Sequence, residues 1–512
     1  MRFVYLIAFI ELICAVYGYK ILVVFPMPAF SHFRLGSTLA DGLAEAGHDV
    51  TLVSPFEDKK VPGNGSLRSV VLSLIRELKN DNNFNIFDIA KSGVFLETLF
   101  MSYIGNDATN RTLEDPALQR LLHSNEKFDV VIIEQFINDE LKALAWHFDA
   151  PLIMFSTMGA TAWLNSISGN PSPPSYIPDT FVEYGSSMTL WQRTKNSLVK
   201  LSHDLTRYFI VYPAQDEMVK RHFPGCPSVE TLSYNVSLFF VNSHESFAQS
   251  VPLVPNMINI GGYHVQPPKK LPVDLQKILD GAKDGVIFFS MGSNIIPSQM
   301  KSETKQALID VLGGLKETVL WKWDEDDLLG KTDNIVIRKW FPQMDVLAHP
   351  NVKLFITHGG LLSTTETIYH GVPILALPVF GDQRLNAAKA VDAGFGVFLH
   401  FQDLTKDLFS SALNEALKNP KYLENARRRS VFLHDRPMKP MDLAVYWTEF
   451  VARFRGAPHL RVAAVDMPWY KYFLVDVMAM LMMMCLVVMT LLYLIVRKVC
   501  CRRTNNLKLK KN

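Results

Sequence analysis

The sequence predicts an α/β protein made of two halves, each with a parallel sheet, and one C-terminal membrane helix. Three observations support this fold class. Short apolar runs alternate with helical patterns along residues 19 to 470, a Pro/Gly-rich stretch interrupts the alternation at 252 to 272, and residues 477 to 496 carry no charge. Strands that alternate with helices are joined by right-handed crossovers, so both sheets should be parallel.

The composition narrows the class of protein. The 512 residues include 52 Lys+Arg against 50 Asp+Glu, so the formal net charge is only +2. We therefore expect no nucleic-acid binding, which usually requires a basic domain. Charged residues make up 20% and hydrophobic residues 48%, too apolar for a disordered chain and too polar for a multi-span transporter. Of the five cysteines only Cys226 lies in the body, which rules out an intrachain disulfide there.

The N-terminus has the layout of a signal peptide over residues 1 to 18. An almost wholly apolar run from Phe3 to Tyr17 follows Arg2, and the small residue Gly18 comes next. We expect cleavage after Gly18. The alternative is an uncleaved anchor or a first buried strand, because Glu11 interrupts the apolar run.

The body divides into an N-terminal domain at 19 to 250, a linker at 251 to 275 and a C-terminal domain with closing helices at 276 to 470. The expected strands of the first domain are 20–25, 48–53, 128–133, 151–155 and 239–242. Those of the second are 285–290, 319–323, 334–338, 352–357 and 372–377. Ligands of such sheets bind beyond the carboxyl ends of the strands, so we expect a cleft between the halves. Residues 165 to 190 are interpreted as a loop insertion over that site.

The C-terminus predicts a single membrane span at 471 to 496, with Trp469, Tyr470 and Tyr472 at the interface. The tail at 497 to 512 is basic, so the positive-inside rule places it in the cytoplasm and the body in the lumen. Lys508 and Lys510 resemble a dilysine retrieval signal, which favours the endoplasmic reticulum membrane and a type I topology. Three sequons fit a luminal body and leave glycosylation open, at Asn64, Asn110 and Asn235.

The stretch from Phe355 to Gln383 has the features of a phosphate site. A strand ends at Thr357, a glycine turn follows, and Ser363 stands in the first turn of a helix, where free N–H groups and the dipole favour an anion. Glu366 lies one turn into that helix, within reach of ribose hydroxyls, and the Asp382-Gln383 pair suits sugar hydroxyls. The spacing matches neither a Walker loop nor a GxGxxG motif. The alternative is a Gly-rich turn with surface polar residues.

The same stretch, FITHGGLLSTTETIYHGVPILALPVFGDQ, resembles the signature of the UDP-glycosyltransferases. The resemblance extends to FSMGS at 289–293, WFPQ at 340–343 and the membrane span with its basic tail. The run EQFIND at 134–139 is most similar to the insect members. The resemblance implies two Rossmann-like domains that face each other across a cleft (GT-B type), a UDP-sugar donor and no metal cofactor.

The resemblance also implies roles by position in the C-terminal domain. Trp340 and Gln343 are expected at the uracil and ribose, and Glu366 at the ribose hydroxyls. The diphosphate is expected at Ser293, His358, Gly360 and Ser363, and the sugar at Asp382 and Gln383. Many relatives have Asn at the position of Leu362, so this chain departs from the pattern there, and the donor preference stays open.

Glycosyl transfer to a hydroxyl needs a base, and a histidine has a suitable pKa. His32 lies in the loop after the first strand, within PAFSH, and resembles the catalytic histidine of the family. Such a base is commonly oriented by a carboxylate. Glu134 stands at the end of the strand at 128–133, and Asp139 follows five residues later. Many relatives have Asp at the position of Glu134, and the longer Glu side chain would require a different position of the backbone. We therefore favour Asp139 as the partner of His32.

The expected reaction is inverting displacement of UDP from UDP-glucose by a hydroxyl of a small lipophilic acceptor, for detoxification or metabolite conjugation. The alternatives are UDP-glucuronate as donor and, in another class, an inactive membrane-tethered binding protein. The acidic run Asp324–Asp327 is interpreted as a solvated loop rather than a metal site. The family also leads us to expect association of copies in the membrane, while the acceptor stays open.

Overall fold

The computed structural model describes residues 18–76, 86–89, 91 and 93–509, with side chains as far as residue 500. The chain separates into a body that ends at Arg461 and a C-terminal unit that begins at Val462. Residues 1–17 of the expected signal peptide, and the side chains of most of the basic tail, lie outside the described residues.

The first half of the body holds a seven-stranded sheet in the order β3-β2-β1-β4-β5-β6-β7, and every pairing is parallel. Its strands are β1 (Lys20–Val24), β2 (Asp49–Ser54), β3 (Ser66–Val71), β4 (Val130–Glu134), β5 (Leu152–Ser156), β6 (Leu238–Val241) and β7 (Met257–Asn259).

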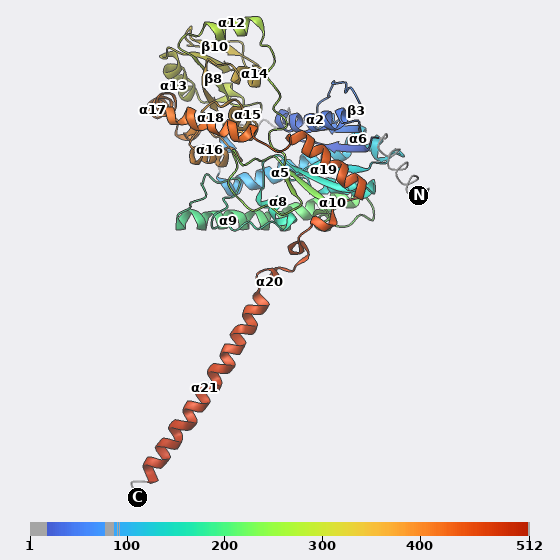
Figure 1. The fold of residues 1–512 in the computed structure, drawn as a ribbon, viewed down its shortest axis with the longest axis vertical. Helices are drawn as coiled ribbons and strands as arrows, with labels where there is room; N and C mark the ends of the chain where they lie inside the picture. The colour runs from blue at the N-terminus through green and yellow to red at the C-terminus, as the bar shows by residue number, and fades with distance from the viewer. Residues whose placement is uncertain (1–17, 77–85, 90, 92, 510–512) are drawn as a thin grey trace. The chain divides into compact units, whose positions relative to one another are not determined.

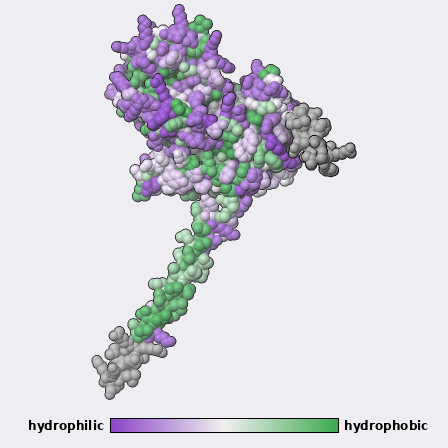
Figure 2. All heavy atoms as spheres, viewed as in Figure 1, coloured by the Kyte–Doolittle hydropathy of each residue, from purple (hydrophilic) through white to green (hydrophobic). Residues whose placement is uncertain are grey.

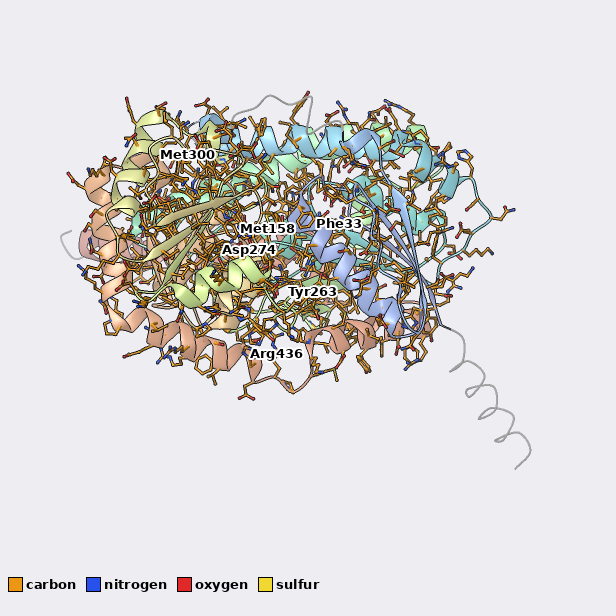
Figure 3. The ribbon with its side chains drawn as sticks, turned by 90° about the horizontal axis from the view of Figure 1, so that it is seen from above. Phe33, Met158, Tyr263, Asp274, Met300 and Arg436 are labelled. Carbon is orange, nitrogen blue, oxygen red and sulfur yellow. The ribbon has the colours of Figure 1, made fainter. Side chains whose placement is uncertain are left out.

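The second half holds a six-stranded sheet in the order β10-β9-β8-β11-β12-β13, also parallel throughout. Its strands are β8 (Val286–Ser290), β9 (Thr318–Lys322), β10 (Ile335–Arg338), β11 (Val352–Thr357), β12 (Ile374–Ala376) and β13 (Gly396–Phe398). Seen from above, the two groups of strands lie side by side, with Met158 between them (Figure 3).

Helices cover both sheets (Figure 1). Those of the first half are α2 (Phe30–Glu45), α4 (Ile86–Ile89), α5 (Val94–Glu114), α6 (Pro116–Leu122), α7 (Ala143–His147), α8 (Ala162–Ser168), α9 (Leu190–Thr206), α10 (Tyr212–His222) and α11 (Val229–Tyr234). Those that follow in the body are α12 (Val273–Gly281), α13 (Ser302–Gly313), α14 (Gln343–Leu347), α15 (Leu361–His370), α16 (Gln383–Asp392), α17 (Lys406–Lys418), α18 (Pro420–His434) and α19 (Pro440–Phe454).

The central strands are continuous apolar runs because both faces of each sheet are covered. β4, β5 and β8 are buried at every position, and β1 at every position except Lys20. This burial is why the expected strands of both series are found in the structure, and why the two parallel sheets of Rossmann type confirm the predicted fold class.

Three strands were not predicted: β3, β7 and β13. β3 is an edge strand with alternating exposure, and β7 and β13 have only three residues each. β7 lies inside the stretch interpreted as linker and pairs with β6. Such short or half-exposed strands lack the apolar run that marks the central strands.

The last helix of the body, α19, returns to the first half of the chain. Ala444 and Val451 of α19 are fully buried in the same core as Leu39 of α2 and Ile132 of β4. A helix inside the expected domain at 276–470 therefore packs on the N-terminal sheet and joins the two halves. The body ends at Arg461, so residues 462–470 of that expected domain belong to the C-terminal unit.

The C-terminal unit contains the short helix α20 (Trp469–Tyr472) and the long helix α21 (Val475–Leu509). The segment Val475–Cys500 is long and apolar enough to cross a membrane and has no buried residues. Figure 2 shows its apolar surface in green. Leu474, with φ of 54°, separates the two helices, so α21 starts after the aromatic residues that the sequence places at the interface.

We expect Phe288→Ala to lower the free energy of unfolding by about 3–5 kcal/mol, since a buried Phe leaves a cavity when truncated. Phe288 is 1% exposed in β8 and stacks on Phe355 at a centroid distance of 4.9 Å. Urea unfolding of the detergent-solubilised chain, followed by tryptophan fluorescence, measures the change. The control Phe454→Ala removes an exposed ring and should stay within about 0.5 kcal/mol; equal losses in the two variants would contradict the assignment of the core.

Candidate active site

A cavity of about 410 Å³ lies where the carboxyl ends of the two sheets meet. Loops after β1, β4 and β5 line it from the first half, and loops after β8, β11 and β12 from the second. Seven of the residues singled out in the sequence contact it: His32, Ser293, His358, Gly360, Ser363, Asp382 and Gln383. The predicted cleft is thus present and collects residues from both halves.

His32 lies in the first turn of α2 and is hydrogen-bonded through Nδ1 to Oε1 of Glu134. The contact follows from the sheet, because β1 and β4 are neighbours and Val24 pairs with Ile133 next to the strand ends. Glu134 is fully buried, whereas His32 reaches the cavity. Burial acts to lower the pKa of His32, but the charge and hydrogen bond of Glu134, with a contribution from Asp382, raise it above its ordinary value.

The preference for Asp139 as the partner of His32 is not what the structure shows. Asp139 begins the 3₁₀ turn Asp139–Lys142, and its Oδ1 accepts hydrogen bonds from Lys142 and from Gln135. Burial acts to raise the pKa of Asp139, and Lys142 more than offsets it, so the pKa is lowered. The length of the Glu134 side chain does not prevent the contact with His32, because Glu134 stands at the end of β4, the strand next to β1.

On the donor side, three of the expected residues form one hydrogen-bonded group. Nε2 of Gln343 lies 3.0 Å from Oγ of Ser363 and 2.6 Å from Oε2 of Glu366. Gln343 opens α14, and the other two lie on the first turns of α15. Burial raises the pKa of Glu366 to about 7, although the hydrogen bond from Gln343 acts to lower it.

Glycines beside the turn before α15 leave space for the imidazole of His358. Gly360 is the N-cap and has no side chain with which to cap the first-turn N–H groups. His358 packs against Gly292 and Gly360, since a Cβ on either glycine would lie within 2.6 Å of its imidazole ring. Burial, with the nearby charge of Lys322, lowers the pKa of His358 to about 4, so this imidazole is neutral and can donate a hydrogen bond.

Trp340 borders the cleft rather than lining the cavity. Its side chain is exposed, and its ring makes an edge contact with Phe30 of the other half at 5.6 Å. Nζ of Lys322, a residue that the sequence analysis did not single out, lies 4.8 Å from the centre of the Trp340 ring and donates to the carbonyl of Gly292. The Lys322 cation thus contacts both Trp340 and the residue before Ser293.

Asp382 and Gln383 lie at the start of α16 and have different contacts. Oε1 of Gln383 accepts the N–H groups of Val379 and Phe380, so it holds the loop before the helix. Oδ2 of Asp382 accepts from Asn386. Burial raises the pKa of Asp382, and the charge of His32 acts to lower it, which places the expected sugar ligand near the expected base.

The cavity wall in the N-terminal half is apolar, and most of it lies outside the motifs described above. The apolar side chains that line it include Phe87, Phe100, Met101, Ile104, Phe136, Ile137, Trp163 and Phe181. The Phe-rich run at 95 to 103 is the sequence feature that indicates this wall, since Phe100 and Met101 line the cavity. Phe95 and Tyr103 of the same run are exposed. Phe181 confirms that the insertion at 165–190 reaches the site.

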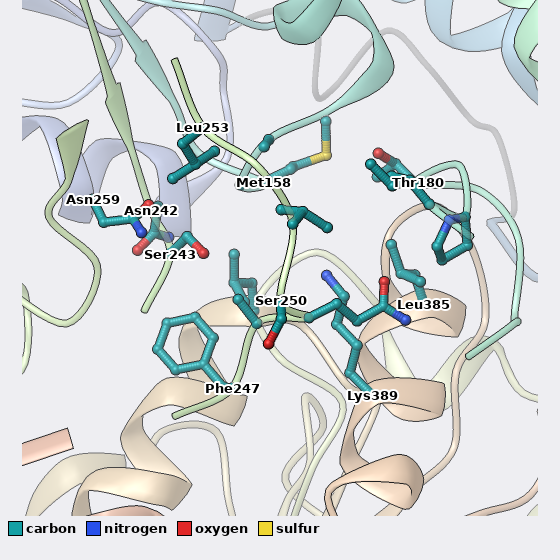
Figure 4. Close-up of a pocket in the computed structure, with 18 of the residues that line it drawn as sticks. Met158, Thr180, Asn242, Ser243, Phe247, Ser250, Leu253, Asn259, Leu385 and Lys389 are labelled. Carbon is teal, nitrogen blue, oxygen red and sulfur yellow. The ribbon is translucent and has the colours of Figure 1, made fainter. Parts of the chain in front are cut away.

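A second cavity, of about 560 Å³, adjoins the first and shares Met158 and Leu361 with it. Figure 4 shows it between the chain after β6, at Asn242 and Ser243, and helix α16 with Leu385 and Lys389. Burial lowers the pKa of Lys389 to about 8, against the effect of Asp382. Among the described residues, no group of three or more His, Cys, Asp and Glu could hold a metal ion.

Comparisons with known proteins agree with this geometry. A family profile described as "UDP-glucoronosyl and UDP-glucosyl transferase" matches residues 20–511. The chain is 36% identical to UDP-glycosyltransferase UGT5 of Dactylopius coccus over 96% of this chain and 94% of that protein. It is 36% identical to UDP-glucosyltransferase 2 of the same insect, over 91% and 90%. It is 31% identical to human UDP-glucuronosyltransferase 2B15, over 88% of both chains.

Among solved structures, the chain is similar to a UDP-glucose: anthocyanidin 3-O-glucosyltransferase in complex with UDP, with a TM-score of 0.56 and 17% identity. The match covers 86% of this chain and all of that chain. A second neighbour, the spinosyn forosaminyltransferase SpnP, gives the same TM-score at 19% identity, over 85% of this chain and 99% of that one. These neighbours support the two-sheet fold.

We expect the binding of UDP-glucose to weaken as the pH falls through about 7, where Glu366 becomes protonated. Above that pKa the carboxylate can accept two hydroxyl protons, and below it one oxygen carries its own proton. UDP-glucose binding measured by calorimetry on either side of this pH tests the point. Glu366→Gln should bind more weakly at high pH and lose the pH dependence; an unchanged pH dependence in this variant would assign it to another group.

Proposed function

We propose a specific reaction for this chain, which belongs to the UDP-glucuronosyl and UDP-glucosyl transferase family and is a UDP-glycosyltransferase. The reaction is transfer of glucose from UDP-glucose to a hydroxyl of a small lipophilic acceptor, with inversion at the anomeric carbon. The observation that carries the proposal is the pairing of His32 with buried Glu134 in the cavity that also contains Asp382.

His32 is the proposed base. Because Nδ1 of His32 is engaged with Glu134, Nε2 is the nitrogen that can take the proton of the acceptor hydroxyl. The oxygen then attacks the anomeric carbon, the bond to UDP breaks, and its electron pair leaves with the diphosphate. The negative charge of Glu134 stabilises the imidazolium that forms, as a carboxylate does in a catalytic triad.

The leaving group is proposed to bind at the N-terminus of α15. The N–H groups after Gly360, the neutral imidazole of His358 and the hydroxyls of Ser293 and Ser363 face the position where charge develops. Glu366 and Gln343 would hold the ribose, and Trp340 would stack on the uracil. Asp382 and Gln383 would bind the sugar.

The chemistry of the cavity favours glucose over glucuronate. None of the described residues that line it is Lys or Arg, whereas a glucuronate carboxylate would require a cation. UDP-glucuronate remains the second candidate, because Lys389 lies in the adjoining cavity and human relatives are named glucuronosyltransferases. The apolar wall of Phe100, Phe136 and Trp163 fits an aromatic or otherwise lipophilic acceptor.

The proposed setting is the endoplasmic reticulum membrane, with the body in the lumen and α21 as the anchor. The apolar segment Val475–Cys500 and the basic residues that follow it support this orientation. A luminal enzyme that conjugates lipophilic hydroxyl compounds would serve detoxification or metabolite conjugation.

The first test is transfer by membranes that contain the full chain, with UDP-glucose and UDP-glucuronate supplied separately to a panel of phenols. We expect glucoside from UDP-glucose, and a loss of kcat of about 10²–10⁴-fold in His32→Ala with UDP affinity retained, because only the base is removed. Binding of UDP without transfer from either donor would favour the inactive binding protein. Transfer from UDP-glucuronate alone would make UDP-glucuronate the donor in place of UDP-glucose.

Glu134→Gln should shift the acidic limb of the pH profile of kcat/KM to lower pH. The carboxylate raises the pKa of His32, and without its charge the burial that lowers this pKa prevails. The maximal rate should also fall, because the imidazolium is no longer stabilised. Asp139→Asn is the matched control, since Asp139 contacts Lys142 rather than His32; a larger shift of the limb in that variant would restore Asp139 as the partner.

A further inference from the structure

A buried ion pair joins the two halves of the body beside the cleft. Glu97 lies in the first turn of α5, in the N-terminal half, and is fully buried. Its Oε2 accepts a hydrogen bond from Nη1 of Arg384 at 2.9 Å, and its Oε1 accepts the N–H of Gly381 at 2.5 Å. These partners are 287 and 284 residues away along the chain and belong to the loop and first turn of α16.

The loop that Glu97 binds is the one that carries Asp382. Gly381 immediately precedes Asp382, and Arg384 follows two residues later, so Glu97 contacts the chain on both sides of it. Arg384 also donates from Nη2 to the carbonyl of Val379 at 3.2 Å. The loop is therefore held from the other half by Glu97 and from within by Gln383.

The helix that carries Glu97 also forms part of the acceptor wall. Phe100, Met101 and Ile104 of α5 line the cavity. They follow Glu97 by three, four and seven residues, which places all four side chains on one face of the helix. One rigid element thus contacts both the expected acceptor and the loop of the expected sugar ligand.

A buried ion pair is weak support for stability, because the desolvation of two charges offsets their attraction. The geometry has a more specific consequence, because the two oxygens of Glu97 hold the loop at two points, Gly381 and Arg384. A displacement of about 1 Å in a substrate-positioning group can slow a reaction by about 10²-fold.

We propose that Glu97 and Arg384 are positioning residues that set the donor-sugar ligand Asp382 against the base His32. The inference rests on the proposed function, because it assigns Asp382 to the sugar. The pair acts across the two halves: the acceptor domain supplies Glu97, and the donor domain supplies the loop that it holds. Binding of an acceptor against α5 is thereby coupled to the sugar position.

The Glu97–Arg384 pair should affect the binding of the sugar and leave the binding of the nucleotide unchanged. The residues expected to hold UDP lie between Ser293 and Glu366, outside the loop that Glu97 contacts. Loss of the pair should leave UDP affinity unchanged within about twofold and weaken UDP-glucose binding by about tenfold, so that the ratio of the two affinities changes. The kcat should fall by about 10²-fold.

The test uses the full chain in detergent, with UDP and UDP-glucose binding measured by calorimetry and kcat and KM measured with the acceptor found in the transfer assay. Glu97→Gln keeps the size of the side chain and removes its charge, and Arg384→Gln removes the other partner. Arg384→Lys keeps a cation and should recover part of the UDP-glucose affinity, which a general loss of folding would not allow.

Asp115→Asn is the matched control, because Asp115 is an equally buried acid at the opposite end of α5, where it caps α6. It should lower the thermal midpoint and leave the ratio of UDP-glucose to UDP affinity unchanged. Equal weakening of UDP and UDP-glucose in Glu97→Gln, or no change in either, would overturn the proposal. A native chain that binds no UDP would instead overturn the proposed function.

Discussion

The parallel arrangement of the strands is the constraint on which the site depends. In a parallel sheet every strand ends at the same edge, so the residues that follow the strands collect there whatever their distance in the sequence. β1 and β4 bring His32 and Glu134 together in this way, and β8, β11 and β12 do the same for Ser293, His358 and Asp382. Two such edges facing each other enclose a site that neither sheet could form alone.

The site concentrates buried ionisable groups whose environments differ. Glu134 is paired with an imidazole, Glu366 is bound by an amide, and Asp382 by another amide, while His358 stands near a cation. Buried charge without a partner is costly, so each group is either paired or shifted toward its neutral form. The two histidines consequently have opposite pKa shifts: that of His32 is raised and that of His358 is lowered. This difference suits one to take a proton and the other to donate a hydrogen bond.

Local patterns were sufficient to predict most of the fold and several residues that line the cavity from the second half of the body. Long apolar strands, the glycine turn before α15 and the Asp382-Gln383 pair are contiguous in sequence, and each local segment specifies its own geometry. The partner of His32 could not be settled this way. Glu134 and Asp139 are five residues apart, and the choice depends on which of them Lys142 neutralises and on how β4 lies against β1. Glu97 was missed for the same reason, since its partners lie in the other half of the chain.

The sequence by itself determined the two series of strands, the glycine turn before α15, the candidate base and the apolar C-terminal helix, because these depend on side-chain periodicity and on short-range backbone chemistry. Only the tertiary structure decided which carboxylate faces His32, which apolar side chains line the cavity, and that Glu97 holds the loop of Asp382 from the opposite half. Contacts between distant segments are set by strand order and by the packing of α5 and α19 across the halves. That packing buries apolar surface from both halves and pairs buried charges such as Glu97 and Arg384, a condition that no local stretch of sequence contains.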